Sequence, residues 1–330
     1  MKRRTLLQAA AGAGALIGVE ARAQGRATIN LQLGWLTSGN QIGEVCAKHL
    51  GYYEAEGLDL RIQAGGPNID GVAIVASGRF EIGQVSSSPS LMLASSQDIP
   101  VRCFAAGAQE HPFSYISRAR NPVRTPRDLI GKRVGTQSTA VILLRAMLAK
   151  HGIAEREVTV IPMGADMSPL MTGQVDVVTG WLTNTTALRV IPDPVAMRLW
   201  DTGVRLYALP YYATAQTVER RGDMLARFLR ASGRGWAYAH ANRDQAVDFL
   251  VREFPNLNRA DEREALEVML QYAFSSRTAA EGWGTMDPAV WREQIELYAG
   301  LGQFARRTPR LEEVMTLDIL RMTGDMRPKI

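Results

Sequence analysis

Small, polar and aromatic residues gather at the points where this sequence predicts strands to end. The first expected strand, residues 28–34, gives way to Trp35 and to the polar run 37–41. In open α/β sheets, ligands bind outside the carboxyl ends of the strands. Side chains of these types supply hydrogen bonds and an aromatic face, and they include no pair of carboxylates placed for acid–base catalysis. The pattern therefore favours binding of a small molecule over its chemical conversion.

Other expected strand ends carry side chains of the same types. The candidates of the first half are Trp35, Ser38, Asn40, Gly66, Asn68, Ser86 and Ser87, and those of the second half are Thr136, Gln137, Ser138, Asp166 and Trp181. Backbone N–H groups at the helix starts after Gln41 and Ser138 could hold a polar or anionic group. The indoles of Trp35 and Trp181 could stack on a flat ring. The remaining tryptophans are expected to pack in the core: Trp200, Trp236, Trp283 and Trp291.

Catalytic and metal-binding signatures are missing from the sequence. It contains no G-x-S-x-G, H-E-x-x-H, P-loop or G-x-G-x-x-G motif in the required context. His49 and His151 fall near helix ends, where capping is expected. His111 is expected at a crossing between the two halves, where it either reaches the ligand or belongs to the hinge. Cys46 and Cys103 either form a disulfide after export or remain buried thiols. We therefore expect no catalytic residue, no metal and no cofactor.

Strands alternate with helices along the first two thirds of the chain. The expected strands are 28–34, 58–66, 79–85, 101–108, 132–137 and 157–164, and the stretch 171–181 is expected to hold a helix end and a further strand that ends at Trp181. This alternation predicts parallel sheets with helices on both faces. The order strand, Gly34, loop, helix recurs as strand, Gly135, loop, helix, which favours two similar lobes. The rest of the chain is mostly helical, with helices expected at 223–241, 243–254, 261–272, 288–301 and 311–322.

The first 23 residues have the features of a secretory signal peptide. Arg3 and Arg4 precede an apolar stretch too short to span a membrane, and Ala21-Arg22-Ala23 is a small-residue cleavage site. The paired arginines favour twin-arginine export, with an ordinary Sec signal as the alternative. Removal of this segment lowers the net charge from +5 to +2, because it carries four basic and one acidic side chains. The remaining charge gives no indication of nucleic-acid binding, and we expect a periplasmic monomer.

Several stretches resemble a known family of binding proteins. These are WLTSGNQIGEVCAKHLGYYEAEGLDLRIQAGGP (35–67), GRFEIGQVSSSPSLMLASSQDIPV (78–101), TPRDLIGKRVG (125–135) and FLRASGRGWAYAHANRDQAVDFLV (228–251). They look like periplasmic substrate-binding proteins of the pyrimidine-precursor-synthase-like group, which includes taurine, alkanesulfonate and nitrate binders. The resemblance implies the type II periplasmic-binding-protein fold, with two doubly wound α/β lobes joined by two hinge crossings. It also implies delivery of the ligand to an ABC permease in the inner membrane.

The resemblance also implies boundaries within the chain. The first lobe would comprise 24–112 and 208–330 with its helical C-terminal part, and the second lobe 113–207. The crossings would fall near 109–115 and 209–214, which adds Gln109, His111 and Tyr212 to the candidate ligand contacts.

The sequence leaves the ligand class open between two chemistries. Sulfonate and nitrate binders need anion donors, and no arginine or lysine occurs at the expected strand-end loops. An aromatic or heterocyclic ligand, such as a pyrimidine thiamine precursor or a flavin, therefore ranks ahead of an anion, although backbone amides alone can bind anions. Two alternatives of another class are a pyrimidine-precursor-type enzyme and a periplasmic sensor subunit. The cysteine-rich stretch of the eukaryotic synthases has no counterpart here.

Overall fold

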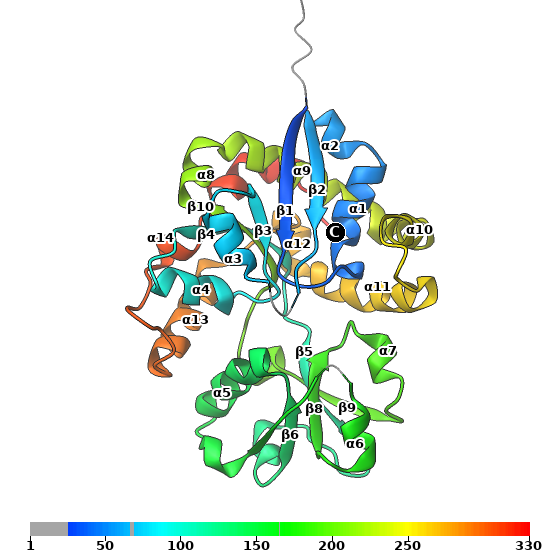
Figure 1. The fold of residues 1–330 in the computed structure, drawn as a ribbon, viewed down its shortest axis with the longest axis vertical. Coiled ribbons are helices and arrows are strands. Elements are labelled where there is room, and N and C mark those ends of the chain that lie inside the picture. The colour runs from blue at the N-terminus through cyan, green and yellow to red at the C-terminus, as the bar shows by residue number, and fades with distance from the viewer. Residues whose placement is uncertain (1–25, 67–68, 165) are drawn as a thin grey trace, which may run out of the picture.

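The chain folds into two lobes joined at a narrow waist, as the computed structural model in Figure 1 shows. The structure describes residues 26–66, 69–164 and 166–330, so the predicted signal peptide, residues 1–23, and Asn68 lie outside the described residues. Each lobe contains one five-stranded sheet. The predicted organisation into two α/β lobes with a helical C-terminal part is confirmed.

The sheet of the first lobe has the strand order β2-β1-β3-β10-β4. Its strands are β1 (Ala27–Leu33), β2 (Leu58–Gln63), β3 (Ile82–Gln84), β4 (Val101–Ala108) and β10 (Ala208–Thr214). The sheet of the second lobe has the order β7-β6-β8-β5-β9. Its strands are β5 (Phe113–Arg118), β6 (Arg133–Thr136), β7 (Thr159–Pro162), β8 (Val177–Trp181) and β9 (Pro194–Arg198).

Both sheets are mixed, whereas the alternation of strands and helices predicted parallel sheets. Strand β10 runs antiparallel to β3 and β4, and β5 runs antiparallel to β8 and β9. The first strand after each crossing is the reversed one. The parallel strands of each lobe end towards the other lobe, so a chain that arrives from there enters the sheet at its carboxyl edge and must run the opposite way. This reversal depends on how the lobes connect and is invisible to local sequence patterns.

Helices and short 3₁₀ turns cover the sheets. Those that follow strands of the first lobe are η1 (Gly39–Gln41), α1 (Ile42–His49), α2 (Tyr52–Ala55), α3 (Gly71–Ala76) and α4 (Pro89–Ser96). Those of the second lobe are η2 (Pro126–Leu129), η3 (Ser138–Ala140), α5 (Val141–Lys150), η4 (Glu155–Glu157), α6 (Ser168–Thr172), α7 (Thr185–Leu188) and η5 (Trp200–Thr202).

The helical C-terminal part packs around the first lobe (Figure 1). It consists of α8 (Ala215–Arg220), α9 (Gly222–Ala241), α10 (Arg243–Glu253), α11 (Arg259–Ala273), α12 (Ser276–Glu281), α13 (Pro288–Gly300), α14 (Leu311–Val314), α15 (Asp318–Met322) and η6 (Gly324–Met326). The single helix expected at 311–322 is thus two short helices. Strands β5 and β9 and the helices α2, α7, α8 and α12 were not predicted. Among the described residues, no helix is both long and apolar enough to cross a membrane.

Helix α9 holds the C-terminal part against the first lobe by close contact with α1. A Cβ atom on Gly43 would lie 2.1 Å from the Trp236 ring, and one on Gly235 would lie 1.9 Å from the Gly43 carbonyl oxygen. Trp236 stacks on Trp283 with ring centroids 5.8 Å apart, and both are fully buried. Trp291 is also fully buried, as predicted, whereas Trp200 is only half-buried. Close helix packing therefore depends on these glycines.

The chain crosses between the lobes at residues 109–112 and again before β10. The second crossing was expected at 209–214, but these residues form the buried strand β10, so the crossing precedes residue 208. We propose lobe boundaries at 24–112 plus 208–330 and at 113–207, because each range contains all the strands of one sheet. Cys46 and Cys103 are buried and unbridged.

Candidate ligand-binding cleft

A cavity of about 770 Å³ lies between the lobes and is lined by residues from both. This volume falls within the range typical of small-molecule sites. The first lobe contributes the loops after β1 and β3, and the second lobe contributes residues at the ends of β6 and β8. The carboxyl ends of the parallel strands therefore meet at the cavity, as expected for open α/β sheets.

The loop after β1 forms a fixed part of the first-lobe wall. The Ser38 hydroxyl accepts the Asn40 N–H at 3.3 Å, and the Ser38 N–H donates to the Gln41 side chain at 3.1 Å. This capping box starts the helix. The buried Gln41 amide then donates to Gln84 at the end of β3, at 2.9 Å. Trp35 lines the cavity from this loop and is 40% exposed, so its indole face is available to a ligand.

The waist of the cleft is formed by His111, Phe113 and Trp181. The His111 ring meets Trp181 edge-to-face at 5.0 Å. Burial lowers the pKa of His111 to about 3, so the ring is neutral at physiological pH. The Phe113 N–H donates to Nδ1 at 3.2 Å, which assigns the ring proton to Nε2. Within the described residues Nε2 meets no acceptor, and His111 therefore has an unused N–H donor.

The second-lobe wall carries amides and hydroxyls. Gln137, Thr139 and Asn184 line the cavity together with Thr179 at the end of β8. The Thr179 hydroxyl donates to Thr136 at 2.6 Å. Met167 and Leu143 add apolar surface, and the buried hydroxyl of Thr185 has no partner within the described part of the chain.

Nine of the predicted site residues line the cavity, which brings together parts of the chain that lie far apart in sequence. They are Trp35, Ser38, Asn40, Gly66, Ser86, Ser87, His111, Gln137 and Trp181. Their contact with a ligand stays a prediction.

Five other predicted site residues do not line the cavity, and each has a structural reason. Gln109 donates its amide to the Thr285 carbonyl at 3.0 Å, and Thr136 is buried behind Thr179. Ser138 is exposed at the start of η3, and Asp166 caps the backbone of Ser168 at 2.9 Å.

Tyr212 is the fifth of these residues, and its ring is fully buried in the first lobe. The side chain packs over β3, where a Cβ on Gly83 would lie 2.2 Å from the Tyr212 ring. The antiparallel entry of β10 into the sheet places it there instead of on a crossing.

The residues missed by the sequence reasoning come mainly from helix α11. Asp261, Glu262, Ala265 and Met269 lie along one side of this helix and line the cavity. Positions spaced by three and four residues share a helix face, but nothing local indicates that this face meets the ends of strands. Asp70, at the start of α3, was missed as well.

The cleft is acidic. Asp70, Asp261 and Glu262 line it, and no lysine or arginine does so among the described residues. Asp261 is paired with Arg189 of the second lobe at 3.0 Å, and Glu264 pairs with the same arginine at 2.8 Å. These ion pairs join the lobes at the rim of the cleft. Across residues 26–66, 69–164 and 166–330, no group of three or more possible metal ligands occurs.

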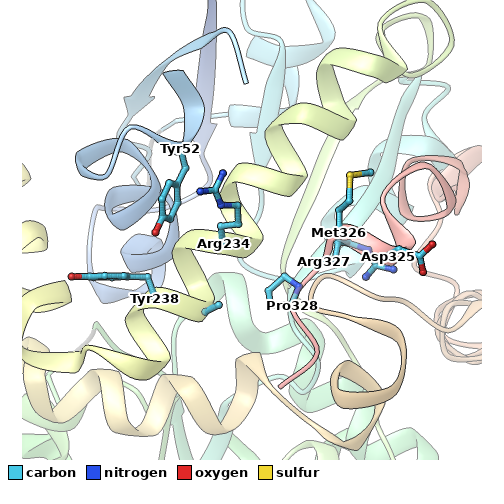
Figure 2. A pocket seen from close by; sticks show the side chains of 8 residues that line it. Tyr52, Arg234, Tyr238, Asp325, Met326, Arg327 and Pro328 are labelled. Carbon is cyan, nitrogen blue, oxygen red and sulfur yellow. The ribbon is translucent and has the colours of Figure 1, made fainter. Parts of the chain in front are cut away.

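A second hollow, of about 530 Å³, lies away from the cleft on the first lobe (Figure 2). Tyr52 and Tyr238 line it together with C-terminal residues such as Met326 and Pro328. The Arg234 guanidinium lies 3.9 Å from the centre of the Tyr52 ring, which is a cation–π contact within the protein. This hollow has no contribution from strand ends and only one lobe lines it, so the interlobe cleft is the better candidate site.

The sequence is similar to those of several proteins of known name. The chain is 25% identical over 264 residues to the riboflavin-binding protein RibY of Chloroflexus aurantiacus, which covers 76% of this chain and 74% of that protein. It is 26% identical over 280 residues to the formylaminopyrimidine-binding protein of Halalkalibacterium halodurans, covering 81% and 83%. A 4-amino-5-hydroxymethyl-2-methylpyrimidine phosphate synthase of Legionella pneumophila is 21% identical over 239 residues, covering 70% and 75%.

A solved structure gives the same fold. The alkanesulfonate-binding protein SsuA from Xanthomonas axonopodis pv. citri bound to MOPS aligns with a TM-score of 0.65 and 16% identity, covering 88% of this chain and 99% of that one. Identity this low supports the fold and says nothing of the ligand. The predicted two-lobed periplasmic-binding fold is thereby confirmed. A model of the family described as NMT1/THI5 like matches residues 38–246, more than half of the sequence, and the chain therefore belongs to the NMT1/THI5-like family.

Proposed function

We propose that this protein is an exported substrate-binding protein that captures a small aromatic or heterocyclic molecule between its lobes and delivers it to an ABC permease. The observation that carries the proposal is the interlobe cavity, which has tryptophans on both sides and neutral polar groups at its waist. Ligand contacts from both lobes would stabilise the closed form, because only a ligand that binds the closed form more tightly can shift the equilibrium.

The charge of the cleft supports a neutral or cationic ring over an anion. No lysine or arginine lines the cavity within the described residues, whereas three carboxylates do. The names of the riboflavin-binding and formylaminopyrimidine-binding relatives point to the same ligand chemistry. A sulfonate or nitrate would have to be held by backbone amides and neutral side-chain donors such as Gln137, without any cation and against these carboxylates.

Native mass spectrometry of protein purified without added ligand tests this proposal. We expect a retained small molecule with an aromatic ring. The intact mass of protein from an exporting host also tests export, since removal of residues 1–23 is expected. A protein that neither retains nor binds any small molecule contradicts the proposal.

An enzyme is the second candidate, because some relatives, the Legionella pneumophila protein among them, are named as synthases. It would need a positioned base or nucleophile at the cavity. His111 is neutral and is a poor base at physiological pH, since its pKa is lowered to about 3. Turnover of the retained ligand by the purified protein would favour the enzyme. A periplasmic sensor would instead bind a receptor and not a permease, which a pull-down from inner membranes distinguishes.

A further inference from the structure

We propose that Glu262 is the specificity-determining residue of the cleft and that it selects a ligand bearing N–H donors, neutral or cationic, against anions. This inference rests on the proposed binding function and adds to it the chemistry of the ligand edge that faces helix α11.

The position of Glu262 is fixed by the start of α11. The Asn258 side chain accepts the N–H groups of Ala260 and Asp261 at 2.9 and 3.2 Å, which caps the helix. Glu262 then lies on the helix face that also carries Ala265 and Met269, and all three line the cavity. The carboxyl group is therefore held at the cavity by a rigid element.

One carboxylate oxygen of Glu262 accepts a hydrogen bond from within the protein. Oε2 accepts the Gly39 N–H at 2.7 Å, and a Cβ on Gly39 would lie 2.7 Å from this oxygen. This contact ties α11 to the loop that carries Trp35. It orients the carboxyl group and leaves Oε1 without a hydrogen bond to the described residues.

Glu262 lacks the cation that its neighbours have. Asp261 and Glu264 both pair with Arg189, whereas Glu262 forms no ion pair within the described residues. Burial raises the pKa of Glu262, the Gly39 N–H lowers it, and the charge of Asp261 raises it. A half-buried carboxylate without a cation gains from a ligand that donates hydrogen bonds to it.

His111, at the waist of the cleft, is an independent observation that indicates a ligand. His111 is 1% exposed, lines the same cavity, and has an Nε2–H without an acceptor in the described chain. A ring that carries donors on one edge and an acceptor on another would satisfy both groups. Trp35 and Trp181 supply aromatic surface for such a ring.

The test compares wild type and two variants, using single-ring probes that differ mainly in charge. Wild type, Glu262→Gln and Glu267→Gln are titrated calorimetrically with benzamidinium, benzamide and benzenesulfonate. Gln keeps an acceptor for Gly39 and removes the charge. Glu267 lies on the same helix but is exposed and does not line the cavity, so its variant is the matched control. Thermal melts check that all three proteins are folded.

We expect wild type and Glu267→Gln to bind benzamidinium more tightly than benzamide and both more tightly than benzenesulfonate. Glu262→Gln should lose about tenfold or more in benzamidinium affinity, as for a hydrogen bond to a charged group, with little change for benzenesulfonate. An unchanged preference in Glu262→Gln overturns the proposal. So does a wild type that prefers benzenesulfonate, binds the three probes equally or binds none of them.

Native mass spectrometry of the same proteins separates the two proposals. A retained sulfonate or carboxylate contradicts the role of Glu262 while leaving the binding function standing. If no molecule is retained and no probe binds, the binding function itself is contradicted.

Discussion

The two walls of the cleft are constructed differently. The first-lobe wall is tied down by hydrogen bonds from Ser38 to Gln41, from Gln41 to Gln84 and from Gly39 to Glu262. The second-lobe wall combines buried side chains such as Met167 with exposed or half-buried polar groups such as Thr183 and Asn184, and no hydrogen bond among the described residues ties it to the first lobe's loop after β1. We infer that the first lobe presents a preformed surface, to which the second lobe adapts as the cleft closes.

The cores below these walls differ in the same direction. The first lobe buries three tryptophans completely, Trp236, Trp283 and Trp291. The largest fully buried side chains of the second lobe are tyrosines such as Tyr115, and a separate cluster there consists of smaller side chains such as Leu170. Large aromatic side chains bury more area and leave larger cavities when truncated. The first lobe should therefore be the more stable half.

The largest expected effect comes from truncating the first-lobe core. Trp236→Ala should lower the free energy of unfolding by about 3–5 kcal/mol, because it opens a cavity between α1 and α9. Urea denaturation followed by circular dichroism measures this loss. Leu170→Ala is the corresponding variant in the second lobe, and it should lower the free energy of unfolding by less. A larger loss from Leu170→Ala would contradict the comparison.

The second effect is a pH dependence that belongs to the first lobe. Burial raises the pKa of Glu44 from its ordinary value of 4.5 to about 8. Between these values the folded protein holds the Glu44 proton while the unfolded chain releases it, so stability falls as pH rises from about 4.5 to about 8. The slope is at most about 1.4 kcal/mol per pH unit.

The variant Glu44→Gln removes this titration. Melting temperatures measured from pH 5 to pH 8 should fall less steeply for Glu44→Gln than for wild type. Parallel curves would mean that Glu44 does not control the slope.

The third effect compares the two tryptophans of the cleft walls, Trp35 and Trp181, in their contributions to ligand affinity and to stability. Trp35→Ala should weaken binding of the retained ligand at least tenfold, about 1.4 kcal/mol, while leaving the melting temperature unchanged, since Trp35 is 40% exposed. Trp181→Ala should lower both the ligand affinity and the melting temperature, because Trp181 also packs on His111. Equal affinity of Trp35→Ala and wild type would remove Trp35 from the site, and loss of folding would assign it to the core.

The smallest effect concerns the ion pairs that join the lobes. Arg189→Glu should repel Asp261 and Glu264 and open the cleft, which small-angle scattering detects as a larger radius of gyration. Exposed pairs contribute about 0.2–1 kcal/mol each, so ligand affinity should fall only a few-fold. Adding Glu264→Arg should restore part of the closed form, whereas failure of this rescue would argue against direct pairing.

The first-lobe wall was the more predictable part of the site. Trp35, Ser38 and Ser87 follow strands directly, and both the strand pattern and the polar residues are local signals. Tyr212 was misplaced because its position depends on how the chain returns between the lobes. Gln109 lies at the predicted first crossing, but its amide donates to the Thr285 carbonyl and does not reach the cavity. The crossing and strand β10 were predicted as one segment, 209–214, but pairing of β10 with β3 and β4 buries Tyr212 in the sheet.

The sequence by itself determined the α/β lobes, the helical C-terminal part and most of the strand-end residues, because periodicity and turn residues act over a few positions. Only the tertiary structure decided that α11 closes the cleft with Asp261 and Glu262. An amphipathic helix reveals that one face is buried but not which partner it meets. That partner is set by contacts between residues far apart in the sequence. Gly43 and Gly235 allow α1 and α9 to approach each other, and Glu262 accepts a hydrogen bond from the Gly39 N–H.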